Sequence, residues 1–340
     1  MGRTKRITLA AAFLIALGLA VGADERSLPS HKRRVFYVDD DGAQCPGALS
    51  TIQSAVDAAD VGALILVCPG TYRETVRVLG ASKNDLTLLA NGDEGQVTIQ
   101  GDHVSWREGM LLEDVSGVRV SGFTFRDHGV PRIPKQYGSG EGIRLNRAHY
   151  CTIDHNYLTN SNMMGITAGN SSHNLFEHNV AVDNDPMMGG CGFHIGGPAS
   201  AQNVIRHNSA SGNASSGIML FNVGRGNVVE HNNVSNNGRS GIFIGNSMGT
   251  IVRKNHANNM SGPMDPLDVP PDIFQKQVGS GIFVSNSSDL EISDNHAKDN
   301  VATDIEWDGV GSVVWDGNHC GSSHPAGLCD SDGDDHDKEE

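Results

Sequence analysis

Residues 203–222 read NVIRHNSASGNASSGIMLFN, and residues 227–246 read NVVEHNNVSNNGRSGIFIGN, so the two segments repeat at an offset of 24 residues. In each segment an Asn is followed nine positions later by Gly and Ile. The same Asn recurs through the second half of the chain, at Asn156, Asn179, Asn208, Asn232, Asn255, Asn295 and Asn318. Three of the six gaps are 23 residues, one is 24, and the other two are 29 and 40. This period is too short for paired-helix repeats, so we expect short parallel strands stacked in a coil.

Stacking explains why one residue type recurs at one position. Each turn of such a coil lays its strands on those of the turn before, so equivalent positions form columns. An Asn that bonds to the Asn one coil away satisfies polar groups that would otherwise be buried without a partner. We therefore predict an all-β fold, a single-stranded parallel β-helix (solenoid) of roughly ten coils.

The N-terminus has the features of a secretory signal peptide over residues 1–23, with three basic residues before an apolar run from Ile7 to Leu19. The solenoid domain is predicted over residues 24–329 and an acidic flexible tail over residues 330–340. We predict a secreted protein, extracellular or, in a cell with two membranes, periplasmic. No later segment approaches the length of a membrane span, so we expect no membrane partner.

The cysteines of an exported chain can form disulfides. We pair Cys45 with Cys68 near one end of the solenoid and Cys320 with Cys329 near the other, where a cross-link would close a loose terminal coil. Cys151 and Cys191 lie within repeats and are predicted to be buried free thiols.

The formal net charge of −15 disfavours nucleic acid and anionic membranes as partners. It also works against a polyanionic substrate, unless basic residues dominate locally or Ca²⁺ bridges the charges. No cofactor is certain from the sequence, and Ca²⁺ is the one ion we consider. We predict a monomer.

A single convincing helix is expected over Ser50–Ala59, before the repeats. Ser50 and Gln53 have the spacing of a capping box, and the apolar stripe consists of Ile52, Ala55, Val56 and Ala59. The open end of a solenoid exposes apolar side chains and unpaired backbone, so we predict that this helix covers it.

Residues 51–59 (TIQSAVDAA) followed by residues 66–72 (LVCPGTY) resemble the opening of pectate-lyase-like right-handed parallel β-helix proteins. The Asn and Gly-Ile repeats match the same superfamily, and the resemblance covers residues 35–320. It implies a right-handed coil. It does not select an activity, because this scaffold carries lyases, hydrolases, epimerases, esterases, adhesins and metal-site assembly proteins.

Three insertions interrupt the repeat, each between its Asn and its Gly-Ile position: Arg126–Glu141, Asp183–Cys191 and Asn259–Ser280. A shared repeat position means a shared side of the solenoid, so we expect all three loops on one side. At the spacing of stacked strands they span roughly 24 Å, enough for about five sugar units. We predict a groove walled by these loops.

The residue after each aliphatic position faces outward, because side chains alternate along a strand. The predicted outward column is Arg144, Thr167, His194, Met219, Phe243, Phe283 and Glu306. A cation, an imidazole, exposed aromatic rings and a carboxylate in line suit a sugar-binding floor. The first two insertions add Asp127, His128, Arg132, Lys135, Tyr137, Asp183 and Asp185.

Abstraction of the proton next to a uronate carboxylate requires a base and a cation that holds the carboxylate. We predict His194 as base or acid, Arg144 for charge neutralisation, and Lys135 or Tyr137 as accessory acid or base. The predicted substrate-binding residues are Arg132, Asp183, Asp185, Phe243, Phe283 and Glu306. The predicted function is a polysaccharide lyase, or an epimerase if the proton is returned, acting on a uronate-containing polysaccharide.

Glycoside hydrolysis would require a pair of carboxylates at a defined separation. Asp183 and Asp185 lie on a turn and cannot both face one site, so we identify no such pair. The alternative to an enzyme is a non-catalytic exported protein: a polysaccharide-binding or surface module, or a copper-handling factor. Soft ligands that suit Cu(I) gather near one corner: Met163, Met164, Met187, Met188, Cys191, His194 and Met219. Methionine also fills irregular gaps under loops.

A column of histidines immediately precedes the repeated Asn in four consecutive coils, at His155, His178, His207 and His231. A column encoded by the repeat is interpreted as packing, although a stack of imidazoles could also bind metal.

Overall fold

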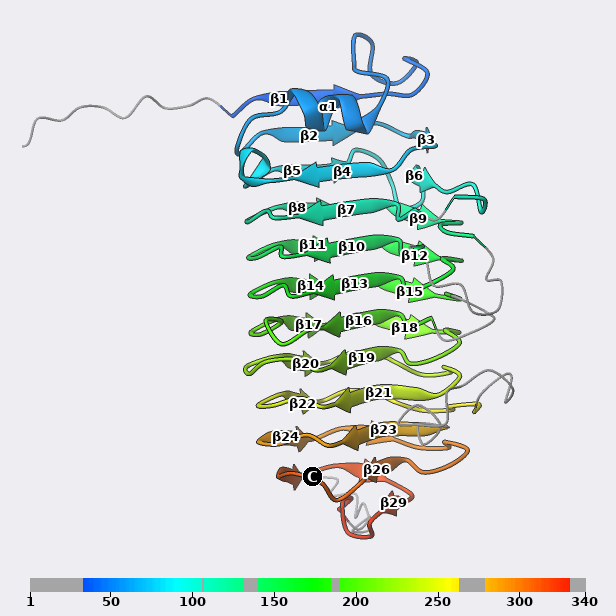
Figure 1. The fold of residues 1–340 in the computed structure, drawn as a ribbon. Coiled ribbons are helices and arrows are strands. Elements are labelled where there is room, and N and C mark those ends of the chain that lie inside the picture. The colour runs from blue at the N-terminus through cyan, green and yellow to red at the C-terminus, as the bar shows by residue number, and fades with distance from the viewer. Residues whose placement is uncertain (1–32, 106, 131–139, 185–189, 263–278, 331–340) are drawn as a thin grey trace, which may run out of the picture. The chain divides into compact units, whose positions relative to one another are not determined.

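The computed structural model describes residues 33–105, 107–130, 140–184, 190–262 and 279–330, which all lie in the compact unit that begins at Arg33. In this unit parallel strands stack coil upon coil, which confirms the right-handed parallel β-helix (Figure 1). The predicted signal peptide and residues 331–340 of the tail lie outside the described residues. No helix within the described ranges is long and apolar enough to span a membrane.

The longest sheet has eleven strands, and its neighbouring strands are parallel and in register. In sheet order the strands are β1 (Val35–Val38), β2 (Leu64–Val67), β5 (Thr87–Ala90), β8 (Arg119–Ser121), β11 (Thr152–Asp154), β14 (Leu175–Glu177), β17 (Val204–Arg206), β20 (Val228–Glu230), β22 (Ile251–Arg253), β24 (Leu290–Ser293) and β27 (Val313–Asp316). Each coil contributes one strand to this sheet, so its eleven strands agree with the roughly ten coils expected from the repeat.

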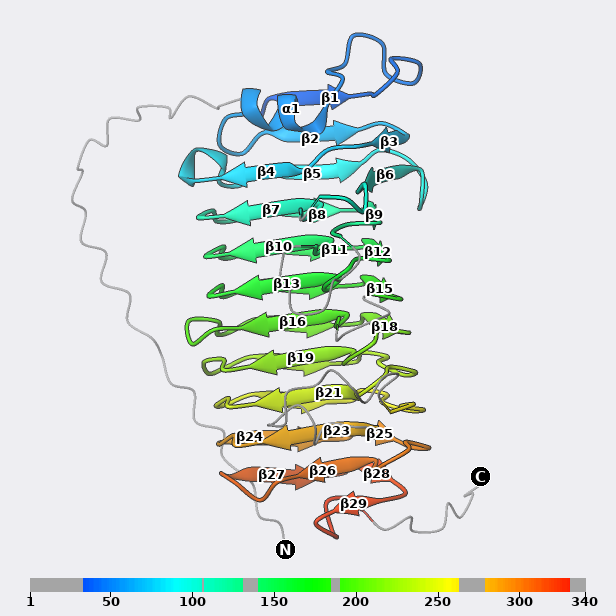
Figure 2. The ribbon, with the colours of Figure 1, turned by 45° about the vertical axis from the view of Figure 1, so that its right-hand side comes forward.

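A ten-stranded sheet forms a second side of the coil and carries the candidate site. Its strands are β4 (Val76–Leu79), β7 (Met110–Glu113), β10 (Ile143–Asn146), β13 (Ile166–Gly169), β16 (Phe193–Gly196), β19 (Ile218–Phe221), β21 (Ser240–Gly245), β23 (Ser280–Ser285), β26 (Ile305–Trp307) and β29 (Ser323–His324). Figure 2 shows these strands above one another, from β4 to β29.

The third side is shorter. Its six-stranded sheet comprises β3 (Gly70–Tyr72), β6 (Val97–Gln100), β9 (Thr124–Arg126), β12 (Tyr157–Thr159), β15 (Val180–Val182) and β18 (Ser209–Ser211). A two-stranded sheet near the other end pairs β25 (His296–Ala297) with β28 (His319–Cys320). A single turn of 3₁₀-helix, η1, covers Ala81–Lys83.

The predicted asparagine ladder is present and buried at the corner that follows the eleven-stranded sheet. Asn156 Nδ2 donates to Asn179 Oδ1 at 3.1 Å, and Asn179 Nδ2 donates to Asn208 Oδ1 at 3.1 Å. The same bond continues through the other members of the repeat, Asn232, Asn255, Asn295 and Asn318. Two shorter ladders were not predicted: Asn174, Asn203 and Asn227, and Asn184, Asn213 and Asn237. Side-chain amides thus satisfy polar groups that the coil buries.

Helix α1 (Ile52–Ala58) lies at the N-terminal end of the core, as predicted, but begins later than the sequence pattern suggested. Its N-cap is Thr51, not Ser50, and the Thr51 side chain accepts from the Ser54 backbone N–H. The predicted capping box is wrong because a carboxylate from another coil takes its place. Both oxygens of Glu74 accept backbone N–H bonds of the first helical turn, at 2.8 and 2.9 Å.

The disulfide predictions are confirmed. Cys45 is bonded to Cys68, and Cys320 is bonded to Cys329. Cys151 and Cys191 form no disulfide with a described residue, and both are buried.

Candidate functional site

The outward column predicted from the sequence lies on the ten-stranded sheet. Parallel pairing aligns Arg144 with Thr167, Thr167 with His194, and His194 with Met219. Their chain neighbours, such as Ile143, point into the core. The complete column is Arg77, Leu111, Arg144, Thr167, His194, Met219, Phe243, Phe283, Glu306 and His324. We call the surface formed by these side chains the outer face.

His194 is partly buried on the outer face and has no hydrogen-bond or ion-pair partner among the described residues. Burial lowers the pKa of His194 to about 4, so the imidazole is neutral near pH 7. Its ring lies over Gly196, where an added Cβ would come within 3.1 Å of His194 Nε2. A neutral imidazole with an unoccupied nitrogen can accept a proton from a ligand.

Arg144 lies two strands from His194, at roughly 9.6 Å between backbones. Its side chain is 41% exposed, and its Nη1 is 3.7 Å from Glu141 Oε1. Between Arg144 and His194, the buried Oγ1 of Thr167 has no hydrogen-bond partner in the described part of the chain. The structure therefore places a guanidinium, a hydroxyl and a neutral imidazole in line on one face.

Sequence reasoning missed two buried glutamates beside this line. Glu108 and Glu141 lie on neighbouring coils, where the Gly109 backbone N–H donates to the Glu141 carbonyl at 2.9 Å. Glu108 Oε1 is 3.8 Å from Arg77 Nη2 on the outer face. The signal was the shared tripeptide Glu-Gly-aliphatic, at residues 108–110 and 141–143.

The prediction of exposed aromatic rings is wrong. Phe243 and Phe283 face outward but are 0% and 1% exposed. Their rings stack with centroids 5.5 Å apart, and together with Met219 and Cys191 they form a second apolar cluster outside the core. Large apolar side chains on adjacent coils gain more from covering one another than from facing water. No sugar can stack on these two rings as they lie, so the candidate site is the part of the outer face from Arg144 to His194.

The three insertions meet the described structure at the same corner. The first joins β9 to β10 and the second joins β15 to β16, so both leave the six-stranded sheet and enter the ten-stranded sheet. The third enters β23 of the same sheet. The predicted site residues within these loops, Arg132, Lys135, Tyr137 and Asp185, lie outside the described residues.

Two other predicted binding residues have no contact with His194 within the described part of the chain. Asp183 is exposed at the turn after β15, with a φ of 53°. Glu306 lies in β26, near the far end of the column, and accepts a 2.8 Å hydrogen bond from Ser280 Oγ.

Several charged groups near the first insertion have structural partners. Asp127 accepts bonds from Arg126 at 2.9 Å and from Asn160. His128 is 2% exposed, and its Nε2 lies 3.1 Å from the Ile99 carbonyl oxygen. Arg147, immediately after β10, donates hydrogen bonds to Asp114 and Glu113, at 2.7 and 2.9 Å. It therefore neutralises acidic neighbours on the adjoining coil.

The soft side chains considered for copper take part in apolar packing. Cys191 and Met219 belong to the second apolar cluster, and Met164 packs against it. Contacts with the phenylalanine rings are those expected of methionine in an irregular gap. Met187 and Met188 lie outside the described residues, and the copper hypothesis stays an untested alternative.

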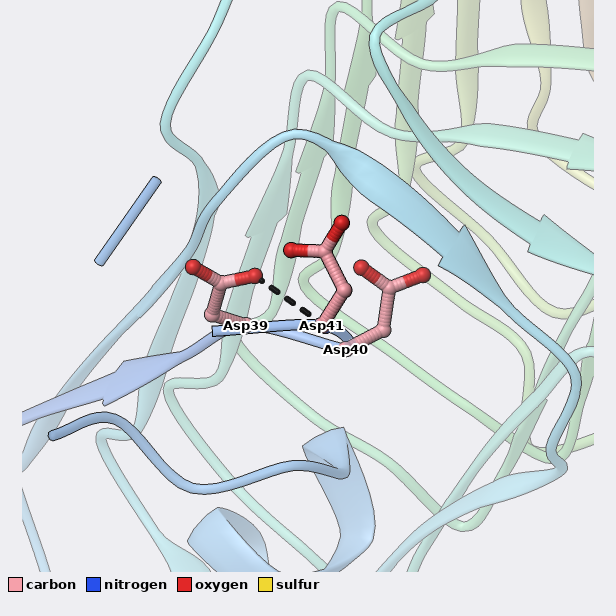
Figure 3. Close-up of side chains that lie close together, drawn as sticks. All are labelled: Asp39, Asp40 and Asp41. Carbon is pink, nitrogen blue, oxygen red and sulfur yellow. Dashed lines mark hydrogen bonds between the residues drawn. The ribbon is translucent and has the colours of Figure 1, made fainter. Parts of the chain in front are cut away.

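One group of potential metal ligands occurs among the described residues, at Asp39, Asp40 and Asp41 (Figure 3). Asp39 accepts hydrogen bonds from backbone N–H groups of the turn that ends at Cys45. Asp40 Oδ2 accepts from the Thr71 backbone N–H at 2.9 Å. These carboxylates hold a turn and a strand end in place, so the cluster has a structural role.

Comparisons with known proteins agree with this architecture. The family described as "Right handed beta helix region" matches residues 141–328, more than half of the chain. No curated protein matches the sequence.

Solved structures with the same fold are distant in sequence. An alginate lyase from Paenibacillus sp. str. FPU-7 has a TM-score of 0.63 at 14% identity, with 80% of this chain and 94% of that chain covered. DFA-IIIase from Arthrobacter chlorophenolicus A6 has a TM-score of 0.57 at 14% identity, covering 85% and 81%. The periplasmic alginate epimerase AlgG has a TM-score of 0.52 at 16% identity, covering 76% and 70%. At such identities the similarity establishes the fold alone.

Proposed function

This chain belongs to the right-handed beta helix family, and we propose that it is a carbohydrate-active member whose outer face acts on a uronate-containing polysaccharide as a lyase or an epimerase. One observation carries the proposal: Arg144, Thr167 and His194 are in register on one outward surface, with the imidazole neutral and unpartnered among the described residues. The names of the distant structural neighbours, which include an alginate lyase and an alginate epimerase, support the same class.

The proposed chemistry begins with the proton next to the uronate carboxylate. Neutral His194 takes this proton, and Arg144 stabilises the negative charge that develops on the carboxylate. Loss of the neighbouring glycosidic oxygen then leaves an unsaturated uronate, which is the lyase outcome. Return of a proton to the opposite side of the ring gives the epimer. Lys135 and Tyr137 are proposed as the accessory acid or base that this second step requires.

The spacing of the outward residues on the outer face indicates how a polysaccharide would lie across the coils. Stacked strands are about 4.8 Å apart, close to the rise of one sugar in an extended chain. A polysaccharide along the coil axis therefore meets about one coil per sugar. Arg77 and Arg144 are separated by one strand, so they can face every second carboxylate of the polymer.

Secretion and a monomeric state are part of the proposal. The two disulfides suit an oxidising compartment. The alternative function is a non-catalytic polysaccharide-binding module that uses the same outer face, and the experiment below separates the two.

The test is to incubate the full chain with alginate, polygalacturonate and hyaluronate, with and without Ca²⁺. A lyase produces unsaturated ends that absorb ultraviolet light, and an epimerase incorporates deuterium from labelled water without shortening the polymer. Replacing the base in His194→Gln should reduce either signal by about 10²- to 10⁴-fold. The matched control is His173→Gln, an exposed histidine that stacks on Tyr150 at another corner.

Absence of both signals on all three polymers would reject the enzyme. Retained binding of a polymer in that case would favour the non-catalytic alternative.

A further inference from the structure

Two adjoining cavities lie at the N-terminal end of the outer face, beside β4. Arg73 and Arg107 are among the residues that line the first, of about 130 Å³, and Arg77 and Arg107 are among those that line the second, of about 650 Å³. Arg107 and Thr75 border both cavities. The larger volume falls in the range of about 300–1,000 Å³ that is usual for ligand sites. The proposed chemistry at His194 uses neither cavity.

Two of the bordering guanidinium groups have their donors available. Arg73 and Arg107 are exposed, and neither has a hydrogen-bond or ion-pair partner among the described residues. Nine other described arginines each lie within ion-pair distance of a carboxylate. Ion pairing is thus the common state of arginine in this acidic chain. Its absence at Arg73 and Arg107 leaves several N–H groups that a ligand can use without breaking an existing contact.

The acidic side chains in the cavity walls already serve as acceptors within the protein. Both oxygens of Glu74 accept backbone N–H bonds of helix α1. Asp102 accepts from two backbone N–H groups of its own turn, and Asp57 Oδ1 accepts from Gln53 Nε2 at 2.7 Å. The guanidinium donors left available in the walls therefore suit a ligand with carboxylate oxygens.

Helix α1 ends the outer face on the side of these cavities (Figure 1). The Arg77 backbone N–H donates to Gln53 Oε1 at 2.6 Å, and Gln53 Nε2 donates to the Arg77 carbonyl at 3.2 Å. The Gln53 amide thus takes the place of a further strand at the edge of β4. Gln53 and Asp57 of the helix also line the larger cavity. Since a helix is about 10 Å across, a polymer that lies along the outer face meets the helix at this cavity.

We propose that these cavities form a further subsite of the outer face, at which Arg73 and Arg107 bind the carboxylate of one uronate of the polysaccharide. Guanidinium groups bind carboxylates through paired N–H bonds, and Thr75 supplies a hydroxyl for the hydroxyl groups of the sugar. The inference takes its substrate class from the proposed function and in that respect rests on it. The subsite binds the polymer and takes no part in the chemistry.

The strand order sets the distance between this subsite and His194. Arg77, which borders the larger cavity, and His194 lie four strands apart in the outward column. At about 4.8 Å per strand the separation is roughly 19 Å, which about four sugars span. An oligomer of six sugars should therefore reach both places, whereas an oligomer of two sugars should reach only one. Because helix α1 ends the surface, further sugars on that side should add no contacts.

The experiment measures binding by isothermal titration calorimetry, with oligomers of two, six and eight sugars prepared from polygalacturonate, alginate and hyaluronate. The full chain carries His194→Gln so that the oligomers stay intact. We expect six sugars to bind about 10-fold more tightly than two, and eight no more tightly than six. Arg107→Gln, and likewise Arg73→Gln, should remove most of this gain. The matched control Lys254→Gln removes one exposed cation after β22 and should retain it.

Thermal unfolding and activity separate this inference from the proposed function. Neither arginine has a partner among the described residues, so both variants should keep the Tm of the parent chain, and a lower affinity then reports the lost ligand contact. The subsite is rejected if six-sugar oligomers bind the arginine variants and the parent chain equally, or if no oligomer binds. The elimination and epimerisation signals of the wild-type chain are scored separately. Their absence together with the loss of binding would reject the enzyme and leave the subsite in place.

Discussion

Burial sets the protonation of two histidines next to the outer face. It lowers the pKa of His128 to about 4, and it does the same for His194. For His128 the hydrogen bond from Nε2 to the Ile99 carbonyl oxygen favours the protonated ring, but burial outweighs it and lowers the pKa. His194 has no partner among the described residues, so its neutral imidazole can accept a proton from a ligand.

We predict that His128 makes the protein sensitive to acid. Below about pH 6.5 the unfolded chain binds a proton at this histidine that the folded protein does not bind until about pH 4. The free energy of unfolding should therefore fall by about 3 kcal/mol through this window as the pH is lowered. His128→Gln, which can still donate to Ile99, should show a correspondingly smaller decrease in urea unfolding at several pH values. An unchanged pH dependence in that variant would contradict the assignment, and His173→Gln serves as the exposed control.

The histidine columns are packing elements, as the repeat suggested. The rings of His155, His178, His207 and His231 stack at centroid distances of 5.0, 5.2 and 5.0 Å. A second stack joins His256, His296 and His319 at 5.1 and 4.8 Å. Because neighbouring rings are nearly parallel, their nitrogen lone pairs run side by side and do not converge on one ion. In the second stack, burial and then the neighbouring imidazoles lower the pKa of His296.

Among the elements, the strands of the ten-stranded sheet differ in what covers their outer side. The position two residues after the outward column is Gly in β13, β16 and β21. In β21 the Phe243 ring occupies the space that a side chain at Gly245 would need, and an added Cβ would clash with it. In β13 the nearest atom to a Cβ built at Gly169 is 3.9 Å away.

The same substitution in these two strands should therefore have opposite effects. Gly245→Ala should destabilise the protein by about 1–3 kcal/mol, because Phe243 must leave its packed position. Gly169→Ala should be neutral or stabilising by about 0.5–1 kcal/mol, since alanine loses less backbone freedom than glycine on folding. Urea unfolding of the two variants measures both effects. Equal destabilisation would show that Phe243 is not held over Gly245.

Helix α1 illustrates how tertiary contacts shift an element boundary. The local sequence offered Ser50 and Gln53 as caps, but Glu74 of a later coil reaches the first helical turn. A carboxylate at a helix N-terminus satisfies free N–H groups and the helix dipole together. The helix accordingly begins at Ile52.

At the scale of the whole molecule, the two disulfides lie in the first and last parts of the described solenoid and close loops of 23 and 9 residues. Cys151 and Cys191 take part in neither disulfide. In the chain-entropy treatment each bond contributes about 3 kcal/mol by restricting the unfolded chain. We predict that the double variant Cys45→Ala and Cys68→Ala loses about this much free energy of unfolding. After denaturation without reductant, mass spectrometry of alkylated protein should count two labelled cysteines. Six labelled cysteines would contradict the pairing.

The coil itself was predictable because its stacking imposes a residue-by-residue rule. A side-chain amide can bond along the axis only to an amide at the same height, so Asn156 and its equivalents recur and set the register. Alternation along a strand then decided that Arg144 and His194 face outward. Cysteine positions near the two ends were sufficient to pair them correctly.

The tertiary structure, and not the sequence pattern, decided which outward-facing side chains are buried. Alternation gives the direction of Phe243 and Phe283 but not what covers them, and packing among successive coils removes both rings from solvent. Likewise, 33 residues and an irregular insertion separate Glu108 from Glu141 in the sequence, and only the stacking of β7 on β10 makes them neighbours. Repeat spacing is a local property that the chain encodes directly. The environment of a side chain depends on every coil and loop around it, and that is decided when the chain folds.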